Sequence, residues 1–138
     1  MLNMRMPKKT GKFYIPKSAF MSARYYALRY HEYIDRYRQL QSEDIDAIDY
    51  SKDRTDGGSQ NSSVESKAIK MAELKEKIEL IENTAVEAGG DIAKYVLKAV
   101  TEEDVPCWLL IKQYDMPCGK KMFYERRRKF YYLLSDRI

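Results

Sequence analysis

Residues 104–138 read DVPCWLLIKQYDMPCGKKMFYERRRKFYYLLSDRI, and this stretch decides the fold expected for the chain. Its pattern predicts two helices separated by a break at residues 116–119 (MPCG), because proline and glycine interrupt helices. The first helix, residues 105–115, is apolar on almost every side, which indicates packing on more than one side and a core position for Trp108. The second helix runs to about residue 136 and is amphipathic.

The two sides of this second helix differ sharply at about 100° per residue. The apolar side is formed by Met122, Phe123, Phe130, Leu133 and Leu134. The opposite side holds Lys120, Lys121, Tyr124, Arg128, Tyr131 and Tyr132, with Arg127 at its flank. Arg126 falls on the apolar side, so its stem is expected to lie along the core while the guanidinium reaches the rim.

A helix that buries one side and turns cations outward suits a groove of nucleic acid. Recognition helices usually read base edges with their N-terminal turns, so we expect Lys120, Lys121 and Tyr124 near the bases. Arg127 and Arg128 are expected at phosphates or guanines, since arginine pairs bidentately with either. A solvated charged surface is the alternative, but such surfaces usually mix signs, and residues 126–129 (RRRK) are an unbroken basic run.

Two longer helices are predicted upstream, at residues 17–41 and 64–88. Their packing positions alternate by three and four residues, which is the spacing of a heptad seam. The seams are Ala19, Ala23, Tyr26, Tyr30, Tyr33, Tyr37 and Leu40 in the first helix, and Val64, Met71, Leu74, Ile78, Ile81 and Ala85 in the second. They favour an antiparallel hairpin or, alternatively, dimerisation. The expected fold is all-α: two long heptad-bearing helices followed by a C-terminal helix-turn-helix bundle.

The expected organisation has three parts. Residues 1–16 form a flexible basic arm, which either follows phosphates or is a frayed terminus. Residues 17–90 form a coiled-coil-like region with an acidic linker at about 42–63, mobile after Tyr50. Residues 91–138 form the helix-turn-helix domain.

The helix ends carry their own signals. Ser18 is expected to cap the first helix and Asp91 the helix at 91–100. Gly89-Gly90 is expected to end the second long helix in a left-handed turn. Thr101 or Asp104 is expected to cap the 105–115 helix, with Pro106 in its first turn.

Charge is segregated along the chain, although the net charge is only +4. Residues 1–41 hold nine lysines and arginines against two acids, a net +7, and residues 116–138 hold seven against two, a net +5. Residues 42–104 hold eight against sixteen, a net −8. Basic ends around an acidic middle favour contact with a polyanion. Mutual neutralisation within the fold is the alternative.

Enzyme, metal and membrane signals are lacking. Cys107, Cys118 and His31 have no zinc-site spacing, and no phosphate-binding glycine loop or paired-carboxylate motif occurs. We therefore expect a non-enzymatic protein without cofactor or metal, with the cysteines as small buried hydrophobes. No apolar run follows the basic N-terminus, so we expect no signal peptide, no membrane span and a cytoplasmic location.

The chain resembles phage-encoded regulators of the RinA/ArpU type. The resemblance rests on the Tyr-rich first helix, the acidic Ser/Gly linker, the second helix, and the segments YVLK (95–98) and VPCWLLIKQYDMPCGKKMFYERRRKFYYLL (105–134). The last segment is also similar to the helix-turn-helix of region 4 in bacterial sigma factors. Residues 17–90 match only as architecture. In that pattern a Ser or Thr often opens the recognition helix, whereas here Gly119 or Cys118 takes its place.

The resemblance implies a small activator of phage late genes that acts at promoter DNA. The first hypothesis is thus a transcription regulator that binds double-stranded DNA, with RNA polymerase as a further candidate partner. A DNA-packaging subunit similar to small terminases is an alternative, since those proteins also join a helix-turn-helix to an oligomerisation part. A third is an interaction module whose basic ends bind an acidic partner such as RNA polymerase. Homo-oligomerisation stays open.

Overall fold

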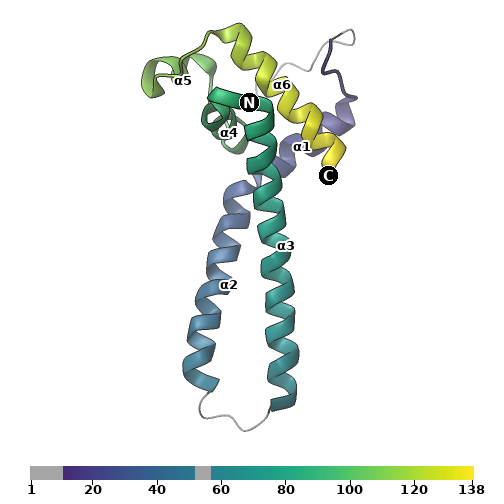
Figure 1. Cartoon of the computed structure of the whole chain (residues 1–138), viewed down its shortest axis with the longest axis vertical. Coiled ribbons are helices and arrows are strands. Elements are labelled where there is room, and N and C mark those ends of the chain that lie inside the picture. Colours follow the sequence, from purple (N-terminus) through teal and green to yellow (C-terminus); the bar gives the residue numbers. More distant parts are fainter. Residues whose placement is uncertain (1–10, 52–56) are drawn as a thin grey trace. The chain divides into compact units, whose positions relative to one another are not determined.

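The computed structural model describes residues 11–51 and 57–138 and is helical throughout its regular elements (Figure 1). Within these residues, six α-helices follow one another: α1 (Lys17–Leu28), α2 (Tyr30–Ser51), α3 (Gly57–Gly89), α4 (Ala93–Thr101), α5 (Cys107–Tyr114) and α6 (Lys120–Arg137). A short 3-10 helix, η1 (Gly90–Ile92), precedes α4. No strand occurs among the described residues. The all-α class predicted from the sequence is confirmed.

Contacts divide the chain into two units. Unit 1 comprises Met1–Tyr30 and Leu80–Ile138, and unit 2 comprises His31–Glu79. The helix-turn-helix region therefore shares its unit with α1 and the last turns of α3. This division differs from the boundary expected at residue 91, because α1 packs against both α4 and α6.

The predicted long helix at 17–41 is interrupted at Arg29. Its φ and ψ are −84° and 3°, and its N–H donates to the carbonyl of Tyr26, three residues back, at 3.3 Å. Such a tightened turn ends α1, and α2 restarts at once. No proline or glycine marks this position, so the sequence carries no local signal for it.

Helix extends into both ends of the predicted linker at 42–63. Helix α2 continues to Ser51 and α3 begins at Gly57, so the linker prediction is wrong at its two ends. A helix that has already formed gains one hydrogen bond for each residue it adds, which favours such extension. Residues 52–56, and residues 1–10 of the predicted arm, lie outside the described residues.

Unit 2 is an antiparallel pair made by α2 and the first part of α3. Lys67 pairs with Glu43 at 3.7 Å, and the Lys77 ammonium lies 5.3 Å from the ring centre of Tyr33. The partner on α2 moves back by ten residues as α3 advances by ten, which is the antiparallel register. Tyr33 and Leu74 are buried, so the predicted seams line this pair. Val64 is exposed, and its place in the seam is wrong.

Among the described residues, the core of unit 1 is built by five α-helices and η1. Its fully buried apolar side chains come from α1 (Ala23, Ala27), the end of α3 (Ile81, Ala88), η1 (Ile92), α4 (Val96, Val100), α5 (Leu110) and α6 (Phe123, Phe130, Leu134). Further polar contacts join the start of α2 and the end of α6 to α3. The hydroxyl of Tyr30, the first residue of α2, donates to Glu82 at 2.6 Å, and Arg137 of α6 donates to Thr84 at 3.0 Å while pairing with Glu87. Arg137 thereby holds the C-terminal end of α6 against α3.

The side-chain caps predicted for three helices are wrong. Pro16, Ile92 and Pro106 occupy the N-cap positions of α1, α4 and α5, and none of these starts has a capping side-chain hydrogen bond. The Thr101 hydroxyl instead donates to the carbonyl of Leu97 at 2.7 Å. Ser18 fails as a cap because α1 begins at Lys17, two residues before the start that this cap would require, and Asp91 fails because α4 begins at Ala93, one residue after it.

The predicted stop at Gly89-Gly90 is confirmed. Helix α3 ends at Gly89, and Gly90 has a φ of +58°, in the left-handed region that favours glycine. A Cβ at Gly90 would meet only the Arg126 guanidinium, at 3.5 Å. Glycine therefore suits this turn because of its backbone conformation, more than because a side chain at Gly90 would lack room.

The Gly90→Ala substitution should lower the free energy of unfolding by about 1–2 kcal/mol, the cost of a left-handed L-residue. Gly90→Asn should lower it clearly less, because asparagine tolerates this region. Urea denaturation followed by circular dichroism measures both. Equal losses for Ala and Asn would show that space, and not φ, controls this position.

Candidate nucleic-acid interface

Helices α5 and α6 form the predicted pair joined by a short turn. Asp115 ends α5 with a φ of +56°, and the Met116 N–H donates to the carbonyl of Leu110, six residues back, at 3.0 Å. The Asp115 N–H donates to the same carbonyl, so two backbone donors close the end of α5 onto Leu110. Met116 is buried, and the Tyr95 hydroxyl donates to the Asp115 carbonyl at 3.4 Å. The turn is thereby tied to α4.

The buried side of α6 is rotated from the predicted one. Phe123, Phe130 and Leu134 are buried as expected, but Tyr131 joins them with 2% of its surface exposed. Its ring meets Phe20 of α1 edge-on at a centroid distance of 5.0 Å. Met122, expected in the core, is instead 38% exposed. Placing Tyr131 on the outer face and Met122 in the core was wrong, because helical period alone ignored α1 as a packing partner.

The five predicted contact residues fall into two groups. Lys120, Lys121 and Arg128 are exposed on α6. Tyr124 and Arg127 are half-buried and lie against each other, with the guanidinium carbon 4.6 Å from the Tyr124 ring centre. The structure therefore brings lysines and Arg128 to the surface and draws Tyr124 and Arg127 toward the core.

Arg127 is held by aromatic rings. Its guanidinium carbon also lies 5.7 Å from the ring centre of Phe123, which in turn meets Tyr124 at 5.3 Å. Burial lowers the pKa of Arg127, while the neighbouring Tyr131 and Tyr124 raise it. Arginine stays charged nonetheless. Arg127 is therefore a partly desolvated cation that stacks on aromatic rings and helps to hold unit 1 together.

Tyr131 is a second buried polar group beside cations. Burial raises the pKa of Tyr131 to about 12, while Arg127 and Arg24 act in the opposite direction. Arg24 is itself 96% buried, since 4% of its surface is exposed. One of its guanidinium nitrogens, Nη2, has no hydrogen-bond partner within the part of the chain that the structure describes. The α1–α6 contact thus contains the buried Arg24 guanidinium, whose hydrogen-bonding capacity the helices only partly satisfy.

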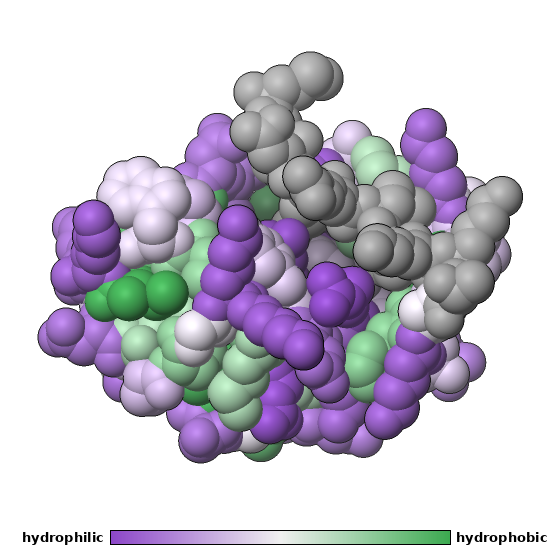
Figure 2. Space-filling view, turned by 90° about the horizontal axis from the view of Figure 1, so that it is seen from above, coloured by the Kyte–Doolittle hydropathy of each residue, from purple (hydrophilic) through white to green (hydrophobic). Residues whose placement is uncertain are grey.

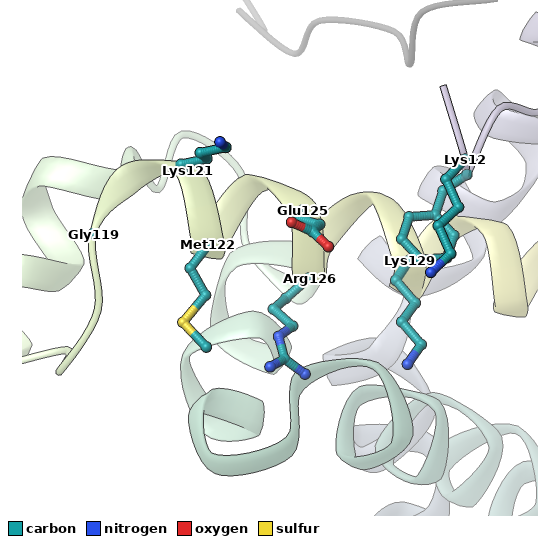
Figure 3. Close-up of a pocket in the computed structure, with 8 residues that line it drawn as sticks. Lys12, Gly119, Lys121, Met122, Glu125, Arg126 and Lys129 are labelled. Atoms are coloured by element: carbon teal, nitrogen blue, oxygen red, sulfur yellow. The ribbon is translucent and has the colours of Figure 1, made fainter. Parts of the chain in front are cut away.

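A groove runs along α6 on the side away from Tyr131. It has a volume of about 590 Å³ and is lined by Lys12, Phe13, Gly119, Lys121, Met122, Glu125, Arg126 and Lys129. In Figure 3, Met122, Arg126 and Lys129 project to one side of α6, and Lys12 enters from the segment before α1. Of these cations, only Lys121 is among the contact residues predicted from the sequence, although Lys12 belongs to the basic arm that was expected to follow phosphates or to fray. The helical period of α6 could not place residues 11–13 beside that helix.

The outward side of α5 corrects another expectation. Trp108, predicted to be core, is 62% exposed, and Ile111 and Tyr114 are also exposed. Only Cys107 and Leu110 of this helix are buried. Helix α5 therefore packs on one side, because α4 and α6 cover a single stripe of it.

The two cysteine thiols differ in their burial. Cys107 is buried and Cys118 is half-buried, and burial raises the pKa of both.

The exposed surface is chemically mixed. Figure 2 shows purple hydrophilic side chains over much of the viewed face, with smaller green hydrophobic areas between them. No cluster of three or more metal-ligating side chains occurs among those that the structure describes, at residues 11–43 and 64–138. The helices of those same ranges include none with the length and apolarity to cross a membrane. The exposed side of α6 thus offers cationic side chains to a ligand, and the described residues contain no metal centre.

Replacing Trp108 with Ala should change the free energy of unfolding by no more than about 0.5 kcal/mol, as expected at an exposed position. Replacing Phe130 with Ala should lower it by about 3–5 kcal/mol, because that ring is fully buried. Chemical denaturation of both variants provides the comparison. A loss above 2 kcal/mol for Trp108→Ala would contradict the outward orientation of α5.

Stability should fall as the pH rises from 10 to 12, in part through Tyr131. Its pKa is higher in the folded chain than in the unfolded chain, so the unfolded state loses this proton first. The contribution of Tyr131 to the free energy of unfolding is complete below pH 10 and disappears as the pH passes 12. Tyr131→Phe should make the decline measured by urea denaturation shallower, whereas Tyr25→Phe, at an exposed ring, should not. An unchanged decline in Tyr131→Phe would contradict the burial of the hydroxyl.

Comparisons with known proteins add no relative at this point. No protein-family model, no curated protein and no solved structure matches the chain.

Proposed function

We propose that the protein is a DNA-binding transcription regulator that contacts the duplex through α6. The supporting observation is the exposed cationic face of this helix, directly after a short turn from α5. Lys121 and Arg128 lie on that face and, within the described residues, have no salt bridge. Lysine and arginine side chains of this kind bind phosphates and displace counterions from them.

The geometry supports a revised set of contacts. Lys120, Lys121 and Arg128 remain as candidates on the exposed side of α6. Arg127 and Tyr124 support the helix from the core side, because their surfaces are taken up by each other and by Phe123. The proposed role is DNA binding without catalysis, in the cytoplasm. The base and phosphate contacts come from the outer side of α6.

The resemblance to phage late-gene regulators adds the promoter as the place of action. A partner protein such as RNA polymerase has separate support from Trp108, Ile111 and Tyr114, whose exposed apolar side chains lie on one helix. Exposed apolar patches commonly mark protein interaction sites. In this second candidate function α5 meets the polymerase, alone or while α6 holds DNA.

The double substitution Lys121→Ala/Arg128→Ala should weaken binding to the DNA next to its own gene. Each lost phosphate contact reduces the slope of log K against log salt concentration by about 0.9, so the magnitude of the slope should fall by about 1.8. The double substitution Lys70→Ala/Lys75→Ala is the matched control, because it removes two exposed lysines from α3 in unit 2. Fluorescence anisotropy at several salt concentrations measures the slopes.

Equal slopes and affinities for wild type, Lys121→Ala/Arg128→Ala and the control would contradict α6 as the DNA-contacting helix. Equal losses in both double variants would mean that net charge, and not this face, controls binding. A Trp108→Ala variant that binds DNA normally but fails to activate a reporter promoter would favour the polymerase contact.

A further inference from the structure

We propose that the groove between residues 11–13 and α6 is a phosphate-binding site, and that its ligand is the backbone of duplex DNA. This inference rests on the proposed DNA-binding function and extends it to residues outside the predicted contact set. The new members are Lys12, Arg126 and Lys129. They add a second line of cations beside Lys121, and the segment before α1 supplies one of them.

The segment before α1 is held in place at the groove. The Phe13 ring meets the Tyr132 ring of α6 at a centroid distance of 5.7 Å. The Tyr14 N–H donates to the Gly11 carbonyl at 3.2 Å, which forms a turn, and Ile15 is buried. Lys12 lies within this turn, so its backbone position is set before any ligand arrives. A positioned cation loses less entropy on binding than one on a free chain.

The charge of the groove is unbalanced. Four cations and one carboxylate, Glu125, line it. Among the side chains of residues 11–43 and 64–138, none of the four cations takes part in a salt bridge, and Lys12 contacts only its neighbouring Phe13 ring through its ammonium, at 5.4 Å. Like charges gathered in a concave surface raise the local potential and attract anions. The four cations repel one another, and a bound polyanion offsets this repulsion with favourable attraction.

The N-terminus of α6 adds to this potential. Gly119 is its N-cap and provides no side-chain acceptor for the free N–H groups of the first turn. A Cβ built at Gly119 would have no atom within 4 Å, so the approach to these groups is open. Free N–H groups and the helix dipole favour an anion at this end.

The length of the groove favours a strand backbone over a single small anion. Lys121 and Lys129 are eight residues apart, which corresponds to about 12 Å along the helix axis. One DNA strand carries a phosphate for each 3.4 Å or so of duplex axis, so this span faces three or four phosphates. Phe13 and Met122 add apolar surface beside the cations, which suits the deoxyribose between phosphates.

The test compares wild type with Lys12→Ala/Lys129→Ala by fluorescence anisotropy across salt concentrations. The magnitude of the salt slope should fall by about 1.8, with a similar loss of affinity for specific and non-specific duplexes, because phosphate contacts carry no sequence information. Lys70→Ala/Lys75→Ala is again the control for net charge. Circular dichroism confirms that each variant is folded.

Phe13→Ala provides a variant that keeps every charge. It removes the ring contact with Tyr132 and so releases Lys12 from its place beside α6. The slope should fall by about 0.9, the equivalent of one phosphate contact. A slope equal to wild type in both Phe13→Ala and Lys12→Ala/Lys129→Ala would overturn the groove as a DNA site.

The outcomes separate this inference from the proposed function. DNA binding lost in Lys121→Ala/Arg128→Ala and unchanged in Lys12→Ala/Lys129→Ala overturns the groove and leaves the function standing. Wild-type protein that binds no DNA at low salt overturns both. Inorganic pyrophosphate that binds wild type but not Lys12→Ala/Lys129→Ala, while this variant keeps full DNA affinity, assigns the groove to a free anion and overturns the DNA ligand.

Discussion

The edge-on contact between Tyr131 of α6 and Phe20 of α1 sets the orientation of the whole candidate interface. The two ring centres are 5.0 Å apart, and both side chains are buried. Because Tyr131 belongs to the core, α6 turns its Tyr124–Arg127 side inward and its Lys121–Arg128 side outward. Helix α1 thus decides which cations of α6 can reach a ligand, although it lies about a hundred residues earlier in the chain.

The cations of unit 1 consequently serve two different purposes. Arg24 and Arg127 are desolvated and lie among aromatic rings, where stacking compensates part of the loss of water. Lys121 and Arg128 keep their water and have no carboxylate partner among the described residues. The basic run in α6 is therefore divided by burial into a structural part and a part available to an anion.

Sequence reasoning succeeded where local rules dominate. The all-α class, the break between α5 and α6 and the stop at Gly90 follow from helical period and from the residues that interrupt helices. It failed where a distant partner decides, as at Tyr131, which α1 covers, and at Trp108, which stays 62% exposed. Arg29 interrupts a helix without any local cause in the sequence. The groove at α6 was also beyond reach, because the nearness of Lys12 to that helix is a tertiary fact.

The proposed interface is a surface of unit 1, so the most direct test maps that surface. Backbone amide NMR signals should be followed while duplex DNA from beside the gene is added. If α6 and the groove bind DNA, the shifts will be concentrated at residues 11–13 and along the exposed side of α6, around Lys121, Arg128 and Lys129, with little change in unit 2. Shifts confined to the α2 and α3 residues of unit 2, or no shifts at saturating DNA, would contradict this interface.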